Sequence, residues 1–181
     1  MRLSQKSQVE RIQLLDRSTD ATPVVATVDV DTPIDRLWDC FRQAHLWPMW
    51  NRCFCWVKND DLVRDDLLLW AFKPIKPWYL YRMPAVARIV EVEPQRKVTW
   101  EVTALPGMYA RHTYFMDDLG AGCTRFGSWE KAMGWGFRMM GGFWTAHFQF
   151  VNRESLAGAR RLGQIYSKHR SFDDPRWLRE A

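Results

Sequence analysis

This sequence of 181 residues has no long apolar run, only four cysteines, and no secretion signal near its first residue. The longest strongly apolar stretch, residues 67–72, is far shorter than the ~20 residues that a membrane-spanning helix needs. Residues 1–20 are polar and lack the apolar centre of a secretion signal. We therefore expect a cytoplasmic protein whose four cysteines are free thiols.

Clusters of basic residues are also missing. Lysines and arginines outnumber acidic residues by 26 to 21, which gives a net charge of +5, but they are scattered and the longest run is Arg160-Arg161. A nucleic-acid groove needs clustered basic side chains, so no nucleic-acid partner is expected. A weak, transient attraction to an anionic membrane surface stays open.

The sequence lacks the G-x-S-x-G, Walker A, G-x-G-x-x-G and H-E-x-x-H signatures of common enzyme classes. Cys53 and Cys55 share a strand face and His45 is not far away, but no second Cys or His pair completes the three or four ligands of a metal site. We therefore expect neither a metal nor a cofactor.

Aromatic residues, in contrast, are abundant: 11 Trp, 10 Phe and 5 Tyr make up 14% of the chain. They supply a large apolar area with few rotamers, which suits both cores and ligand pockets. Because eleven tryptophans exceed what a core of this size needs, several are expected at a pocket or an interface.

The first part of the chain predicts a strand followed by two short helices. Residues 24–30 are rich in Val and Thr, as strands are. Asp31-Thr32-Pro33 then starts a helix, with Asp31 or Thr32 as its cap and Pro33 in the first turn. Pro48 starts a second short helix, and residues 7–17 form a candidate helix before the first strand.

The middle of the chain predicts a run of antiparallel strands. The expected strands are residues 53–58, 67–72, 85–92, 98–103, 109–116 and 124–132. Gly120-Ala121-Gly122 closes the last hairpin. Residues 72–81 form an aromatic loop with two prolines and two lysines, which either covers a cavity or only connects two strands.

The last part predicts one long helix over residues 135–166, with apolar residues on one face and arginines on the other. Such a helix is roughly 45 Å long and crosses a small sheet. Strands followed by a helix indicate an α+β domain with the helix on one face of an antiparallel sheet. Gly141-Gly142 marks a kink, a close approach or room for a ligand, unless the helix begins after it.

Several short motifs follow one another in a consistent order. They are VDVDTPIDRLW at 28–38, WPMWN at 47–51, VEVEP at 90–94 leading to VTW at 98–100, HTYF at 112–115 with GCT at 122–124, and Glu130 with Gly134. In this order they resemble the START-related or SRPBCC superfamily, and within it the polyketide cyclase/dehydrase and lipid-transport-like branch.

This resemblance covers residues 23–166 and implies the helix-grip fold. In that fold a curved antiparallel sheet wraps around a long C-terminal helix, with two short helices after the first strand. The resemblance also implies a hydrophobic cavity between sheet and helix for an apolar ligand, such as a lipid, an isoprenoid or sterol, or an aromatic polyketide. Residues 1–22 then form an N-terminal extension, and residues 167–181 form a tail that we expect to be loosely attached.

The Gly-Ala-Gly loop predicts which residues face each other in the last hairpin. It places His112 directly opposite Glu130, with Cβ atoms about 5 Å apart. A shift of one residue would bring Trp129 opposite His112 instead. A carboxylate beside an imidazole suits general acid or base catalysis, so both residues are candidate catalytic groups. The alternative is a pair that only fixes the register or faces solvent.

Strand alternation and helix phase predict an aromatic cavity wall. Its expected members are Trp70, Phe72, Trp100, Tyr114, Trp144 and Phe148. Glu101 would add a polar anchor for a ligand hydroxyl if it faces inward, and otherwise would be exposed. His147 either touches the ligand from the edge of the helix or is a core residue.

Three functions are compatible with these features. The first is a non-catalytic binder or carrier of an apolar small molecule. The second is a cyclase, aromatase or dehydratase that uses acid–base residues in the same cavity. The third is an interaction module that docks a partner through exposed tryptophans. We prefer the binder, because the sequence contains no unambiguous polar constellation, and the oligomeric state stays open.

Overall fold

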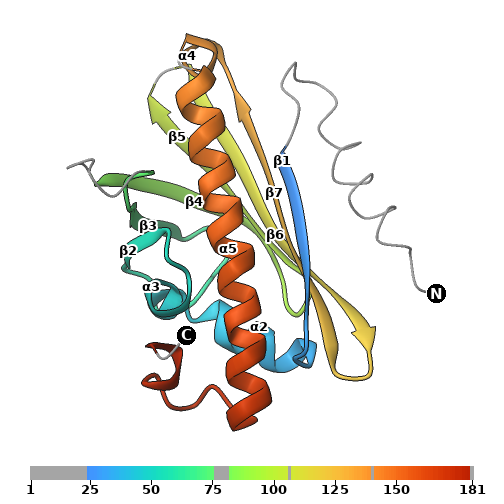
Figure 1. Ribbon diagram of the computed structural model, residues 1–181. Coiled ribbons are helices and arrows are strands. Elements are labelled where there is room, and N and C mark those ends of the chain that lie inside the picture. The colour runs from blue at the N-terminus through green and yellow to red at the C-terminus, as the bar shows by residue number, and fades with distance from the viewer. Residues whose placement is uncertain (1–23, 76–81, 106, 140, 180–181) are drawn as a thin grey trace.

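The computed structural model describes residues 24–75, 82–105, 107–139 and 141–179 (Figure 1). Across these residues, seven strands form one antiparallel sheet in the order β1-β7-β6-β5-β4-β3-β2. The strands are β1 Val24–Val30, β2 Phe54–Val57, β3 Leu67–Phe72, β4 Met83–Glu93, β5 Lys97–Leu105, β6 Met108–Gly120 and β7 Cys123–Met133. The candidate helix at 7–17 and residues 76–81 of the aromatic loop lie outside the described residues.

Two short helices follow β1, as predicted: α2 (Ile34–Arg42) and α3 (Trp47–Trp50), with the 3₁₀ turn η1 (Ala44–Leu46) between them. The cap prediction is wrong, since Pro33 is the N-cap and α2 has no side-chain cap hydrogen bond. Thr32 instead lies in a turn. Its backbone N–H donates to the Val30 carbonyl, and its own carbonyl accepts a bond from the Thr124 hydroxyl.

The C-terminal helix α5 (Gly141–His169) crosses one face of the curved sheet, with the short helix α4 (Trp135–Met139) before it (Figure 1). The architecture is therefore the predicted α+β helix-grip fold. The helix predicted at 135–166 is present as α4 and α5 on either side of residue 140, which lies outside the described residues. No helix within the described ranges is both long and apolar enough to cross a membrane.

Gly141 and Gly142 lie in the first turn of α5, where both are exposed. A Cβ atom added at either position would meet nothing within 4 Å, so a close approach does not explain these glycines. Gly158 is different, because its Cβ would lie 2.7 Å from the Trp50 ring and 2.8 Å from the Trp50 carbonyl oxygen. This glycine lets α3 approach α5, and Arg161 donates to the same carbonyl at 3.1 and 2.6 Å.

Most of the tryptophans of the short helices belong to the core. Trp47 is fully buried and packs against Phe41, Phe54 and Trp100, with ring centroids 5.2 to 5.8 Å apart. Its indole N–H donates to the Phe41 carbonyl at 2.6 Å. These contacts join α2 and α3 to strands β2 and β5 of the sheet.

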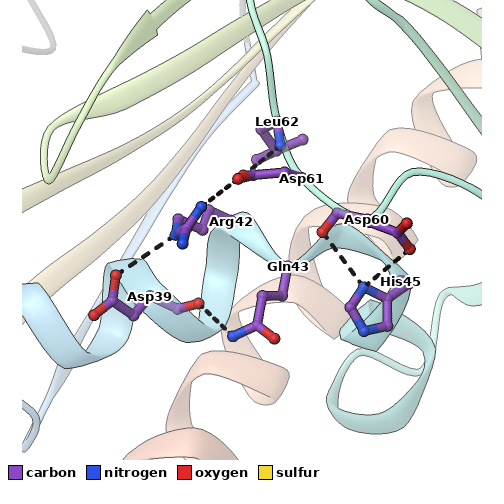
Figure 2. Close-up of polar contacts among 7 residues, drawn as sticks. All are labelled: Asp39, Arg42, Gln43, His45, Asp60, Asp61 and Leu62. Atoms are coloured by element: carbon purple, nitrogen blue, oxygen red, sulfur yellow. Dashed lines mark hydrogen bonds and ion pairs between the residues drawn. The ribbon is translucent and has the colours of Figure 1, made fainter.

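Polar contacts fasten the end of α2 to the connection between β2 and β3 (Figure 2). Arg42 lies 3.6 Å from a carboxylate oxygen of Asp39 and also pairs with Asp61. The His45 Nδ1 lies 3.4 Å from the Asp60 carbonyl oxygen. All of these groups are partly exposed, so the contacts position the connection more than they add stability.

The C-terminal tail is packed against the domain, contrary to the prediction of loose attachment. The tail contains the 3₁₀ turn η2 (Trp177–Arg179), in which the Leu178 side chain is fully buried. The Trp177 ring stacks on His169 with centroids 4.3 Å apart and planes at 6°. The turn η2 contacts both α3 and α5, so this part of the tail gains apolar contact with the same helix that covers the sheet.

Candidate functional site

A cavity of about 200 Å³ lies between the sheet and the C-terminal helices. Strands β2 to β7 and helices α4 and α5 supply its lining, most of which is aromatic or aliphatic. The structure brings together every aromatic residue predicted for this wall: Trp70, Phe72, Trp100, Tyr114, Trp144 and Phe148. The sequence did not predict two further aromatic residues of the wall, Phe54 of β2 and Phe137 of α4, and the Phe137 ring packs on Trp144 with centroids 4.9 Å apart.

The hairpin of β6 and β7 has the predicted register, so His112 faces Glu130 directly. Gly120, Ala121 and Gly122 have φ angles of 78°, 54° and 75°, and this left-handed backbone fits glycine best. The His112 Nδ1 lies 3.6 Å from the nearer Glu130 carboxylate oxygen, which is an ion-pair distance rather than a hydrogen bond. Both side chains are buried and line the cavity.

The His112 ring is held firmly. Its Nε2 lies 2.9 Å from the Ser128 hydroxyl, and its ring packs on Trp100 and Tyr114 with centroids 4.9 and 4.4 Å apart. Ser128 was not predicted, although it precedes Glu130 by two residues and therefore shares its face of β7. The hydrogen bond at Nε2 and the two ring contacts hold the imidazole so that Nδ1 lies toward Glu130.

Tyr114 links the sheet to α5 and to the turn after α3. Its hydroxyl is 2.6 Å from the Ser155 hydroxyl, which also accepts a bond from the Asn51 amide at 3.0 Å. The Asn51 side-chain oxygen Oδ1 accepts a bond from the Cys53 backbone N–H at 3.1 Å. Burial raises the pKa of Tyr114 well above its usual value, so the phenol stays protonated.

Four buried polar atoms of lining residues have no hydrogen-bond partner among the described residues. They are the second carboxylate oxygen of Glu130, Nδ1 of His147, and the indole N–H groups of Trp70 and Trp144. Burial lowers the pKa of His147, and the charge of Glu130 opposes this shift, so the imidazole is neutral at pH 7. The sequence left the role of His147 open, and the structure places it in the cavity wall.

Glu101 does not line the cavity, and its assignment to the ligand site is corrected here. The Arg111 Nε donates to its carboxylate at 2.9 Å, and the Glu101 side chain is 43% exposed. Alternation along β5 turns Glu101 to the face opposite Trp100, which does line the cavity.

No cysteine is among the described lining residues of the cavity, and Cys40 and Cys53 are buried elsewhere. Burial raises the pKa of the Cys40 thiol to about 12 and that of Cys53 well above its usual value. Over the described residues, no three His, Cys, Asp or Glu side chains are grouped to hold a metal ion. The acid–base groups of the cavity are therefore carboxyl, imidazole and phenol.

No protein-family model matches the sequence. No curated protein sequence matches it either. Solved structures do match. A START superfamily protein from Mycobacterium smegmatis is 10% identical with a TM-score of 0.58, and the match covers 79% of this chain and 99% of that one. Norcoclaurine synthase from Thalictrum is 13% identical with a TM-score of 0.52, over 75% of this chain and 94% of that one.

The di-domain ARO/CYC protein BexL of the BE-7585A biosynthetic pathway is 15% identical with a TM-score of 0.60. The match covers 81% of this chain but 47% of that one, so this chain spans about half of the di-domain protein. At these identities the likeness is one of fold. The chain therefore shares the helix-grip fold of START, ARO/CYC and norcoclaurine synthase structures, as its sequence motifs predicted.

Proposed function

We propose that the protein binds an apolar small molecule, of the lipid, isoprenoid or aromatic polyketide-like class, between its sheet and α5. The observation that carries this proposal is the cavity of about 200 Å³, whose walls are mostly aromatic and aliphatic. An apolar cavity of roughly 150 Å³ holds a benzene molecule. This cavity therefore suits a ligand portion of one or two fused rings, or a bent alkyl segment of similar volume.

The lining supports binding by the hydrophobic effect. Aromatic and aliphatic side chains surround the space, and few polar groups interrupt them. Transferring ~150 Å² of ligand surface from water to such walls is worth about 4 kcal/mol at 25 cal/mol per Å². The firm positions of His112 and Tyr114 keep the polar part of the wall in place without a ligand, which reduces the ordering cost of binding.

A second candidate function is acid–base catalysis in the same cavity, as a cyclase, aromatase or dehydratase would need. One observation favours it: His112 and Glu130 lie 3.6 Å apart, both buried and both in the cavity wall. Such a pair is able to move a proton to or from a bound ligand. We rank this function second, because a buried pair of this kind also serves to fix strand register.

Native mass spectrometry of the purified full-length protein tests ligand binding directly. We expect a co-purified apolar molecule that is absent or depleted in Ala110→Leu, since Ala110 is 6% exposed, lines the cavity and leaves no room for a larger side chain beside a ligand. Ala146→Leu is the matched control, because Ala146 is exposed on α5. Equal ligand content in both variants would contradict the proposed site.

His112→Gln separates the two functions once the ligand is known. It keeps a similar volume and a hydrogen-bonding group but does not titrate. A carrier keeps its ligand and its exchange rate in this variant, whereas an acid–base enzyme keeps binding but loses turnover by about 10²-fold or more. Unchanged turnover from pH 5 to 8 would exclude proton transfer by His112.

A further inference from the structure

Two sets of polar groups can be distinguished in the cavity wall, apart from the exposed Thr103 and the His112 Nδ1, which lies beside Glu130. His112 Nε2 and the Tyr114 hydroxyl are bonded to serine side chains and have little left to offer a ligand. The unpartnered set consists of one carboxylate oxygen of Glu130, one imidazole nitrogen of His147, and the two indole N–H groups of Trp70 and Trp144. Glu130 and His147 are only 8% and 3% exposed, so bulk water has little access to their side chains.

This second set has a definite hydrogen-bonding composition. The carboxylate oxygen is an acceptor, the two indoles are donors only, and a neutral imidazole nitrogen is one or the other. A buried polar group left without a partner costs about 1–3 kcal/mol. The ligand that satisfies this set must therefore supply a donor for Glu130 and lone pairs for the indoles.

A hydroxyl group meets both requirements, since it donates one hydrogen bond and accepts two. An ammonium group has three donors and no lone pair. It would donate to the one free carboxylate oxygen of Glu130, but it could not accept a hydrogen bond from either indole N–H group. A carboxylate would suit the indoles but would place a second negative charge near Glu130. No Lys or Arg is among the described lining residues to offset this charge, His112 already lies beside Glu130, and the pKa of His147 is lowered by burial.

We propose that the ligand carries a hydroxyl group on an apolar ring system, that this hydroxyl donates to the free oxygen of Glu130, and that ligands ending in a carboxylate are rejected. This proposal rests on the apolar-ligand function proposed above and adds the polar chemistry that selects among apolar ligands. Glu130 is thus a specificity residue for a neutral, hydroxylated ring compound.

Equilibrium dialysis of the full-length protein at pH 7 tests the proposal with four probes of one ring size: naphthalene, 2-naphthol, 2-naphthoate and 2-naphthylmethylammonium. We expect 2-naphthol to bind about tenfold tighter than naphthalene, the effect of one hydrogen bond to a charged acceptor. Both charged probes should bind at least about tenfold more weakly than 2-naphthol.

The four probes separate failure of the hydroxyl preference from failure of apolar-ligand binding itself. If naphthalene binds but 2-naphthol binds no better, the hydroxyl inference is wrong and the apolar cavity function stands. Binding of 2-naphthoate or of the ammonium probe as tight as that of 2-naphthol also refutes it. If naphthalene itself does not bind, the proposed function fails and the inference fails with it.

Glu130→Gln assigns the effect to the carboxylate. In this variant the preference for 2-naphthol over naphthalene should shrink to within about threefold, and 2-naphthoate should gain affinity, because the charge is gone. Glu101→Gln is the matched control, since it makes the same chemical change on the sheet but outside the cavity. An unchanged preference in Glu130→Gln, or an equal loss in Glu101→Gln, would overturn the assignment.

Discussion

Ser155 offers the sharpest test of how the sheet is joined to the helix. Its side chain is fully buried in α5, and its hydroxyl is 2.6 Å from the Tyr114 hydroxyl and 3.0 Å from the Asn51 amide. Ser155→Ala removes one oxygen and almost no volume. It leaves the Tyr114 phenol, on β6, without its partner, and the Asn51 amide loses one as well.

The expected cost follows from these two partners. A buried polar group that loses its only hydrogen bond costs about 1–3 kcal/mol. With two groups affected, the free energy of unfolding should fall by about 3 kcal/mol. For a domain of this size, 1 kcal/mol lowers Tm by about 2–4 °C, so Tm should fall by roughly 6–12 °C.

Urea titrations followed by tryptophan fluorescence measure this change, in a double-mutant cycle with Tyr114→Phe. Because both variants break one bond, their effects should fall short of additive by about 1 kcal/mol or more. Ser171→Ala is the control, since Ser171 bonds to Asp173 at an exposed site and should change stability by less than about 0.5 kcal/mol. A loss below about 1 kcal/mol in Ser155→Ala, or strict additivity, would refute the reasoning.

Three further predictions concern stability. Because burial lowers the pKa of His147 below 6.5, the unfolded chain takes up the proton first as pH falls, so the contribution of His147 to stability is full above pH 6.5 and declines below it. Urea titrations at pH 7 and pH 5 should therefore show a smaller loss of stability in His147→Gln than in the unmodified protein. Equal losses in the two proteins would contradict this. Gly158→Ala should lower the free energy of unfolding by about 1–3 kcal/mol, because the new methyl group clashes with Trp50. Gly142→Ala, whose methyl group meets no atom within 4 Å, should be neutral or stabilising, and equal effects of the two variants in thermal melts would exclude the close contact at Gly158. Leu178→Ala should cost about 2–4 kcal/mol and speed proteolysis of the tail, and no effect would mean that the tail is not packed.

The sequence predicted the sheet well because its signals are local. Alternation marks each strand, and the Gly-Ala-Gly loop fixes the register that brings His112 to Glu130. The error at Glu101 has the same origin, since one residue along a strand decides which face a side chain takes, and Arg111 on the neighbouring strand shows which face that is.

The features that the sequence did not predict depend on contacts between distant residues. Ser155 meets Tyr114 and Asn51 from 41 and 104 residues away, and no local pattern encodes that meeting. The same applies to Leu178, because its turn η2 contacts the distant helix α3 as well as the preceding helix α5. A leucine in a polar tail carries no local sign of its partner.

The division of the cavity's polar groups into two sets has a physical consequence that links stability to selectivity. Groups that are satisfied within the protein, such as the Tyr114 hydroxyl, stabilise the fold and lose that stabilisation when a partner is removed. The free oxygen of Glu130 contributes no such bond, so its burial is a cost to the folded state that a ligand hydroxyl would offset. Ser155→Ala should therefore lower stability and keep the preference for 2-naphthol, whereas Glu130→Gln should lose the preference at little cost in stability. If each variant changed both the stability and the preference for 2-naphthol, the two sets would belong to one network.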